Sequence, residues 1–179
     1  KSKLPKMQSS EMAFAASGNT LVVDEQGKAW FTTGGLSASV YSSVDYGESW
    51  IKTSVPLFTK AETAGGYGLG LNGIGQVFVV GGDYKQRAKS YKNMASIVNN
   101  EWVLADSGNL GLRSAISCQK SICIATGKTG NDISYDAGKT WQVLINDNSG
   151  SVDKGFYTLA SDKGVFLFAG HDGYLSVLK

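Results

Sequence analysis

Four apolar segments that end in small residues and glycine recur along the chain at nearly constant intervals. They cover residues 29–35 (AWFTTGG), 77–82 (VFVVGG), 122–127 (ICIATG) and 165–170 (VFLFAG). Their marker glycines, Gly34, Gly81, Gly127 and Gly170, are 47, 46 and 43 residues apart. Apolar runs without alternation are typical of strands buried on both faces. This period predicts repeated small sheets, as in a β-propeller.

A second pattern, Ser-x-Asp-x-Gly-x-Ser/Thr-Trp, follows two of these segments at residues 43–50 and 134–141. Asp accepts hydrogen bonds from backbone N–H groups in a turn, and Gly supplies a backbone conformation that a Cβ resists. We therefore expect Asp45 and Asp136 to bind their own turns, with Trp50 and Trp141 packed between sheets. The pattern resembles the Asp box of bacterial neuraminidase repeats, and a degenerate copy ends at Trp102. The residues with this predicted structural role are Ser43, Asp45, Gly47, Trp50, Ser134, Asp136, Gly138 and Trp141.

These landmarks predict an all-β chain: a single propeller unit over residues 1–179 with four consecutive four-stranded blades. The predicted blades cover residues of about 11–55, 66–106, 112–145 and 156–179. The last blade is incomplete because the chain ends after its third strand, and residues 1–10 are a candidate, though poor, strand to fill that gap. An open arc exposes an apolar sheet at its end. We therefore expect missing N-terminal blades or a second copy to close the ring, with tightening of the four blades into a small closed ring as the further alternative.

The sequence also resembles one bacterial family in detail. The resemblance lies in residues 12–18 (MAFAASG), 80–85 (VGGDYK), 112–115 (LRSA) and 130–134 (GNDIS), in that order. The family consists of Asp-box propellers of the BNR, or sialidase-like, kind; it is related to photosystem II stability/assembly factors and is often labelled "oxidoreductase". The resemblance implies an exported propeller of six or seven blades, of which this chain corresponds to the C-terminal half.

Composition narrows the function further. The net charge of +2 gives no electrostatic basis for binding nucleic acid, and no apolar run reaches the length of a membrane span. The start of the chain lacks both an initiating Met and a signal segment, so we expect a processed chain or one cut from something longer. No dinucleotide fingerprint, metal-ligand cluster or haem motif is present in the sequence. We therefore expect no cofactor and no metal.

The sequence contains few motifs that would support an enzyme. A sialidase grips its substrate carboxylate with three arginines, whereas this chain has only Arg87 and Arg113. A glycosidase needs only two carboxylates, but the spacing marks out no pair among the 15 Asp and Glu residues. The single His171 lies in a Gly-His-Asp-Gly turn, with no nucleophile motif to accompany it. The sequence thus contains no complete catalytic constellation, and we assign no catalytic residue; enzyme activity is kept only as the alternative hypothesis.

The two cysteines, Cys118 and Cys123, flank a predicted hairpin turn. They could form a disulfide across the turn or remain two small reduced strand residues. An exported location, as the resemblance implies, favours the disulfide.

The predicted topology separates two faces. The Asp-box turns join the third and fourth strands of a blade, so they lie opposite the loops that join the second and third strands (B–C loops) and the connections between blades (D–A connections). The B–C face also collects Arg87, Lys128 and Asn131, with Phe156 and Tyr157 on a D–A connection. The candidate binding residues on this face are Asp83, Tyr84, Lys85, Arg113, Asp132, His171 and Asp172.

Loops held by a rigid scaffold favour binding. The first functional hypothesis is a non-catalytic module that recognises a protein partner through this face. The alternatives are a carbohydrate-active propeller, either a glycosidase or a lectin, and a structural fragment whose working surface needs further blades.

Overall fold

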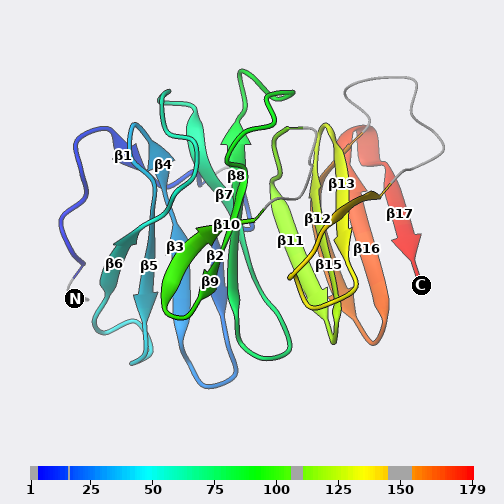
Figure 1. The fold of residues 1–179 in the computed structure, drawn as a ribbon, viewed down its shortest axis with the longest axis horizontal. Coiled ribbons are helices and arrows are strands. Elements are labelled where there is room, and N and C mark those ends of the chain that lie inside the picture. Colours follow the sequence, from blue (N-terminus) through cyan, green and yellow to red (C-terminus); the bar gives the residue numbers. More distant parts are fainter. Residues whose placement is uncertain (1–3, 16, 106–110, 145–154) are drawn as a thin grey trace.

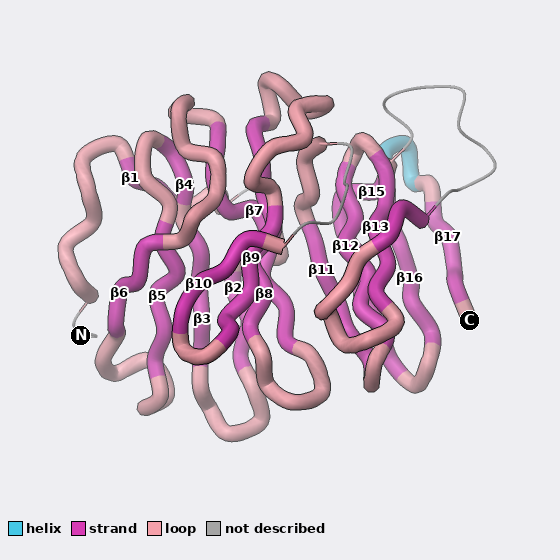
Figure 2. The backbone as a smooth tube through the Cα atoms, in the orientation of Figure 1, coloured by secondary structure: helices cyan, strands magenta, loops and turns pink. Residues whose placement is uncertain are grey.

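The computed structural model describes residues 4–15, 17–105, 111–144 and 155–179, and these residues form strands, turns and one short 3-10 helix, η1 (His171–Gly173). The predicted all-β architecture is confirmed. Four antiparallel sheets stand side by side as propeller blades, and the strands run up and down in the view of Figures 1 and 2.

Each blade is a meander of antiparallel strands, and two further short strands extend the sheet of blade two beyond its first strand. Blade one contains β2 (Leu21–Val23), β3 (Ala29–Thr32), β5 (Ser39–Ser43) and β6 (Ile51–Ser54). Blade two contains β7 (Ala64–Leu71), β8 (Val77–Asp83), β9 (Met94–Val98) and β10 (Glu101–Leu104). Blade three contains β11 (Ala115–Gln119), β12 (Ile122–Gly127), β13 (Gly130–Ser134) and β14 (Gln142–Leu144). Blade four contains β15 (Phe156–Asp162), β16 (Val165–Gly170) and β17 (Leu175–Leu178).

Apolar layers between neighbouring blades hold the array together. Val40 of blade one packs in one buried cluster with Val77 and Val79 of blade two. Other clusters join Phe78 of blade two to Ile116 of blade three, and residues such as Ile124 of blade three to the phenylalanines of blade four. The blades form a row, with β6 at one end of the molecule and β17 at the other in Figure 1.

One residue ahead of blade one reaches all the other blades. The backbone carbonyl of Asn19 accepts a hydrogen bond from the N–H of Leu69 in blade two, at 2.8 Å. Its side-chain amide donates to the carbonyl of Ser114, next to blade three, at 3.4 Å. Its side-chain oxygen accepts from the hydroxyl of Thr158 in blade four, at 3.0 Å. The first strands of the four blades therefore converge near Asn19.

The expectation that residues 1–10 complete blade four is wrong for the residues that the structure describes. The N-terminal segment instead leads into β1 (Glu11–Met12), which pairs with β4 (Gly34–Gly35), and β4 in turn pairs with β7 of blade two. Glu11 is buried there, and its carboxylate accepts hydrogen bonds from Thr33 at 2.6 Å and from Lys52 at 2.5 Å. A buried carboxylate keeps its charge only beside such donors, and the nearby donors belong to blade one.

Close backbone approach explains the recurring glycines. A Cβ on Gly81 would lie 1.8 Å from the carbonyl oxygen of Gly65, and a Cβ on Gly127 would lie 2.0 Å from that of Leu112. No side chain fits at such distances. In blade one the position equivalent to Gly127 is Thr33 rather than Gly34, because Ser43 pairs with Ala29 as Ser134 pairs with Cys123. The sequence marker is thus one residue off in blade one, where Gly34 belongs to the added β4.

Blade four leaves an apolar surface uncovered by the described residues. Phe166 and Phe168 point into the cluster shared with blade three, so the residues that alternate with them face away from it. We call the outward side chains of Leu167, Leu175 and Val177 the blade-four end face, and their exposed fractions are 45%, 62% and 53%.

The two Asp-box turns make matching hydrogen bonds. The carboxylate of Asp136 accepts from the N–H of Thr140 at 2.8 Å and from its hydroxyl at 2.6 Å. Asp45 accepts from the N–H and hydroxyl of Ser49 at 2.9 and 2.5 Å. Each tryptophan ring donates to the glycine carbonyl of its own turn at 3.0 Å. The Trp141 ring packs against Phe78 of blade two, whereas that of Trp50 packs within blade one.

These bonds predict a pH dependence of stability. Hydrogen bonds from the Thr140 side chain, and then from its backbone, lower the pKa of Asp136 from 3.8 to about 2. A folded-state pKa below the unfolded one adds stability that is present above about pH 4 and lost as the pH falls through about 2. We expect Asp136→Ala to lower the urea midpoint at pH 7 and to have little effect at pH 2. Asp162→Ala, at an exposed strand end, is the control; an equal loss at both pH values would contradict the prediction.

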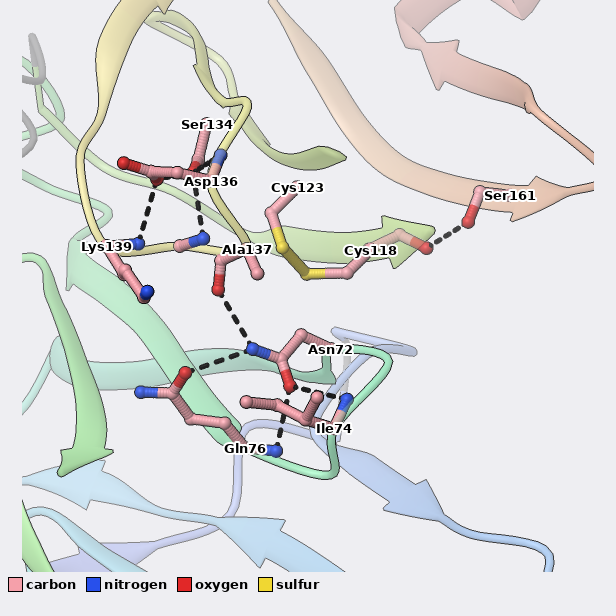
Figure 3. Close-up of a disulfide and its surroundings, with 12 residues drawn as sticks. Asn72, Ile74, Gln76, Cys118, Cys123, Ser134, Asp136, Ala137, Lys139 and Ser161 are labelled. Carbon is pink, nitrogen blue, oxygen red and sulfur yellow. Dashed lines mark hydrogen bonds between the residues drawn. A yellow bond between two sulfur atoms is a disulfide. The ribbon is translucent and has the colours of Figure 1, made fainter. Parts of the chain in front are cut away.

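Figure 3 shows the surroundings of the disulfide between Cys118 and Cys123, which pair directly across β11 and β12. The disulfide lies beside the Asp-box turn of blade three. The side-chain amide of Asn72, in the turn after β7, donates to the carbonyl of Ala137 in that turn at 2.9 Å. The side-chain oxygen of Asn72 accepts from the N–H groups of Ile74 and Gln76 in its own turn. At this end of the molecule, the disulfide and the hydrogen bonds of Asn72 hold the turns of blades two and three in place.

Candidate binding cavity

The opposite end of the strands carries a cavity of about 580 Å³. Residues from all four blades or their leading segments line it. The aromatic and charged lining residues are Tyr67, Tyr84, Arg87, Lys128 and Tyr157. β13 begins near this end and leads to the Asp-box turn at the other, so the cavity and Asp136 lie at opposite ends of blade three. This is the face that the topology predicts for binding, formed by B–C loops and D–A connections.

The three tyrosines are held in different ways. Tyr67, in β7, stacks on Phe14 with ring centroids 4.4 Å apart, and its hydroxyl donates to the carbonyl of Thr63 at 2.7 Å. Burial raises the pKa of Tyr67, and the nearby Tyr84 and Asp83 raise it further, so the phenol stays neutral. Tyr84 and Tyr157 are partly exposed at the rim. The cavity thus has one fixed aromatic wall and two accessible rings.

Two cations supply the charge of the cavity. The ammonium of Lys128 lies 4.6 Å from the centroid of the Tyr157 ring, a cation–π distance. The Nε–H of Arg87 donates to the carbonyl of Tyr84 at 3.1 Å, which ties this side chain to its own loop. The described lining residues include no carboxylate. The cavity therefore favours a ligand that combines an apolar or aromatic group with negative charge.

Arg113 and Asp132 were both predicted on the face of B–C loops and D–A connections, and the structure does bring them together. They lie inside the protein, however, rather than on its surface. The guanidinium of Arg113 donates twice to the carboxylate of Asp132, at 2.7 and 3.2 Å, and both side chains are 0% exposed. A third donation reaches the hydroxyl of Thr129 at 3.0 Å. Burial raises the pKa of Asp132, and Arg113 opposes that rise. This pair positions the loop that carries Lys128 and is closed to a ligand.

Asp83 is also buried. One of its oxygens accepts from the Thr63 hydroxyl at 2.6 Å and from the N–H of Lys85 at 2.9 Å, while the other has no partner among the described residues. Lys85 is exposed beside it. Asp83 therefore shapes the turn that places Tyr84 at the cavity.

His171 and Asp172 lie in η1 of blade four, exposed and paired with each other at 2.6 Å. They do not line the cavity, and nor do Lys85, Asp83, Arg113 or Asp132. Of the predicted binding residues only Tyr84 lines it. Arg87, Lys128 and Tyr157 belong to the face that the sequence indicates, whereas Tyr67, within a glycine-rich strand, carries no sequence signal for a site.

No group of three or more His, Cys, Asp or Glu side chains in the described part of the chain is placed to hold a metal ion. No helix in the same residues is long and apolar enough to cross a membrane.

The chain was compared with family models, curated proteins and solved structures, and only the solved structures match it. No protein-family model matches the sequence, and no curated protein matches it. A solved structure described as "YCF48 bound to D1 peptide" matches with a TM-score of 0.57 and 15% identity, over 94% of this chain and 52% of that one. A xyloglucanase of family GH74 from Xanthomonas campestris matches with a TM-score of 0.49 and 17% identity, over 93% of this chain and 27% of that one.

These findings define the class of the protein: it has a β-propeller fold. The chain spans about half the length of the first solved structure that it matches.

Proposed function

We propose that this chain is a non-catalytic binding module that recognises a segment of a protein partner through the cavity. The observation that carries the proposal is the joint lining of the cavity by three tyrosines and two cations. Tyrosine gives a large contact area at low entropic cost and is enriched in binding hot spots. The solved propeller described as bound to a peptide supports the proposal by analogy of fold.

A peptide-display selection on the purified chain tests this proposal. We expect enriched peptides to contain an aromatic or aliphatic residue beside a carboxylate. Tyr157→Ala should weaken such a peptide by at least about tenfold, since it removes an accessible ring and the surface on which Lys128 rests. Tyr135→Ala is the matched control, because Tyr135 is an exposed tyrosine in the Asp-box turn of blade three.

Two outcomes of that selection would contradict the proposal. Equal losses in Tyr157→Ala and Tyr135→Ala would remove the cavity as the site. Binding to a glycan array that Tyr157→Ala abolishes, with no peptide enriched, would favour the carbohydrate alternative.

We further propose that blades outside this chain cover the blade-four end face. Counted back from the marker glycine, Leu167 is the third residue, as are Phe78 in blade two and Ile124 in blade three. Phe78 and Ile124 are fully buried against the next blade, whereas Leu167 is 45% exposed. Leu21 and Val23 are similarly exposed in blade one. The end face therefore has the character of an interface between blades. The proposed blades that cover it are either N-terminal blades absent from this chain or blades of a second copy.

We also propose that the protein works in an exported, oxidising location. The disulfide between Cys118 and Cys123 supports this, because such bonds persist mainly outside the reducing cytosol. Alkylation of intact cells before lysis checks it: both cysteines should stay unmodified until a reductant is added. Modification without reductant would contradict the proposal.

A further inference from the structure

The loop between β8 and β9 concentrates positive charge. We call residues 84–92, which read YKQRAKSYK, the basic loop; it contains four cations and no carboxylate. The whole chain, by contrast, is nearly balanced, with 17 Lys and Arg residues against 15 Asp and Glu residues. Lys85, Lys89 and Lys92 are exposed. Figures 1 and 2 show the loop projecting beyond the end of β8, at the top of the view. The chain therefore carries a local cationic surface that its net charge does not show.

Hydrogen bonds of the main chain fix the shape of the basic loop. The N–H of Lys85 donates to the carboxylate of Asp83 at 2.9 Å, and Asp83 is itself buried. The carbonyl of Lys92 accepts from the N–H of Phe58, on the connection between β6 and β7, at 3.1 Å. Because these bonds use backbone groups of the loop, its ammonium groups remain on the surface. A loop that is already ordered also loses little conformational freedom when it binds.

Aromatic rings lie among the cations of the basic loop. Tyr84 and Tyr91 are 46% and 53% exposed. The ammonium of Lys89 lies 4.4 Å from the centroid of the Phe58 ring, and that of Lys92 lies 5.3 Å from the centroid of the Tyr91 ring. Lysine can pack its apolar stem along such rings while its charged end stays in water. The loop thus presents amphipathic tyrosine rings and ammonium groups side by side.

The shape and the chemistry of the basic loop fit an anionic surface better than a single peptide. The loop projects outward, and of its residues only Tyr84 and Arg87 line the cavity. Lysine is a point charge without the fork with which arginine grips one carboxylate. Several ammonium groups match a layer of phosphate headgroups, and tyrosine rings favour the headgroup level of a bilayer. We propose that the basic loop binds the surface of a bilayer that contains anionic phospholipids. The proposal is independent of the cavity, because Lys85, Lys89 and Lys92 are not among its described lining residues.

Sedimentation with lipid vesicles tests the proposal. The purified chain should sediment with vesicles of phosphatidylcholine and phosphatidylglycerol in equal parts, stay in solution with phosphatidylcholine alone, and be released by added salt. One lysine near such a surface contributes about fivefold to the affinity. The triple variant Lys85→Gln, Lys89→Gln and Lys92→Gln should therefore bind at least about thirtyfold more weakly. These substitutions keep the backbone groups that fix the loop.

A matched control removes the same charge at the opposite end of the strands. Lys28, Lys139 and Lys163 are exposed there, in turns between neighbouring strands, and their replacement by Gln should leave vesicle binding unchanged. Circular dichroism establishes that both triple variants are folded. The single variant Lys85→Gln keeps the lysine–ring contacts of the loop and should still weaken binding about fivefold.

Three results would overturn the proposal. They are equal losses in the two triple variants, equal binding to neutral vesicles, and no binding to the anionic vesicles. In the last case, capture of the chain by polyglutamate would assign the basic loop to an acidic polypeptide instead.

Discussion

Replacing Arg113 by methionine should destabilise the fold by about 3–5 kcal/mol, because it leaves the Asp132 carboxylate buried without its partner. Both side chains are fully buried, so water cannot replace the lost donors. Urea unfolding at pH 7 measures the loss. The double variant Arg113→Met with Asp132→Leu should recover much of it, since an apolar pair needs no ion partner.

The pH dependence distinguishes this cause from simple loss of packing. Burial raises the pKa of Asp132, and the hydrogen bonds and charge of Arg113 oppose that rise, so removing Arg113 leaves the effect of burial unopposed. A folded-state pKa above the unfolded value means that the folded form gains stability as the pH falls and the carboxyl takes up a proton. The loss in Arg113→Met should therefore shrink between pH 7 and pH 4. A loss that is constant with pH, and that the double variant does not relieve, would contradict the ion-pair explanation.

Ile124→Ala should cost about 2–5 kcal/mol, whereas Leu167→Ala should cost less than half as much. Both residues precede their marker glycine by three positions, but Ile124 is fully buried between blades three and four and Leu167 is half exposed. Truncation of Ile124 leaves a cavity between two sheets, while truncation of Leu167 removes a side chain that water already touches. Urea unfolding of the two variants gives the comparison.

The same pair of variants reports on the end face. If further blades or a second copy cover Leu167 in the purified sample, the two losses should become similar, and that of Leu167→Ala should depend on protein concentration. Similar losses in a dilute monomer would contradict the placement of Leu167 on an open face.

The repeat could be predicted from the sequence because close packing of backbones leaves a visible trace. Gly81 and Gly127 recur since a Cβ has no space beside the neighbouring carbonyl, and the Asp-box turns require side chains that bind their own backbone. Gly34 resembles these markers but serves β4, so only the strand register shows the shift.

The candidate site was harder to predict because the sequence of a loop does not show which of its side chains are buried and which are exposed. Arg113 and Asp132 were expected on the correct face, yet their opposite charges draw them together inside the protein. Tyr67 enters the cavity from a strand whose glycines give no sign of function. The expectation that residues 1–10 form a strand of blade four is wrong for a related reason. The burial of Glu11 against Thr33 and Lys52 depends on residues distant in sequence, and the sequence pattern does not show such contacts.

Asn19 changes how the row of blades should respond to strain. An array in which each unit touches only its neighbours can peel apart from one end, one unit at a time. Here the side chain of Asn19, which precedes blade one, is hydrogen-bonded both to Ser114, just before blade three, and to Thr158 in blade four. Opening blade four therefore also breaks the hydrogen bond between Thr158 and Asn19, which precedes blade one. The array should come apart as one cooperative event rather than by peeling.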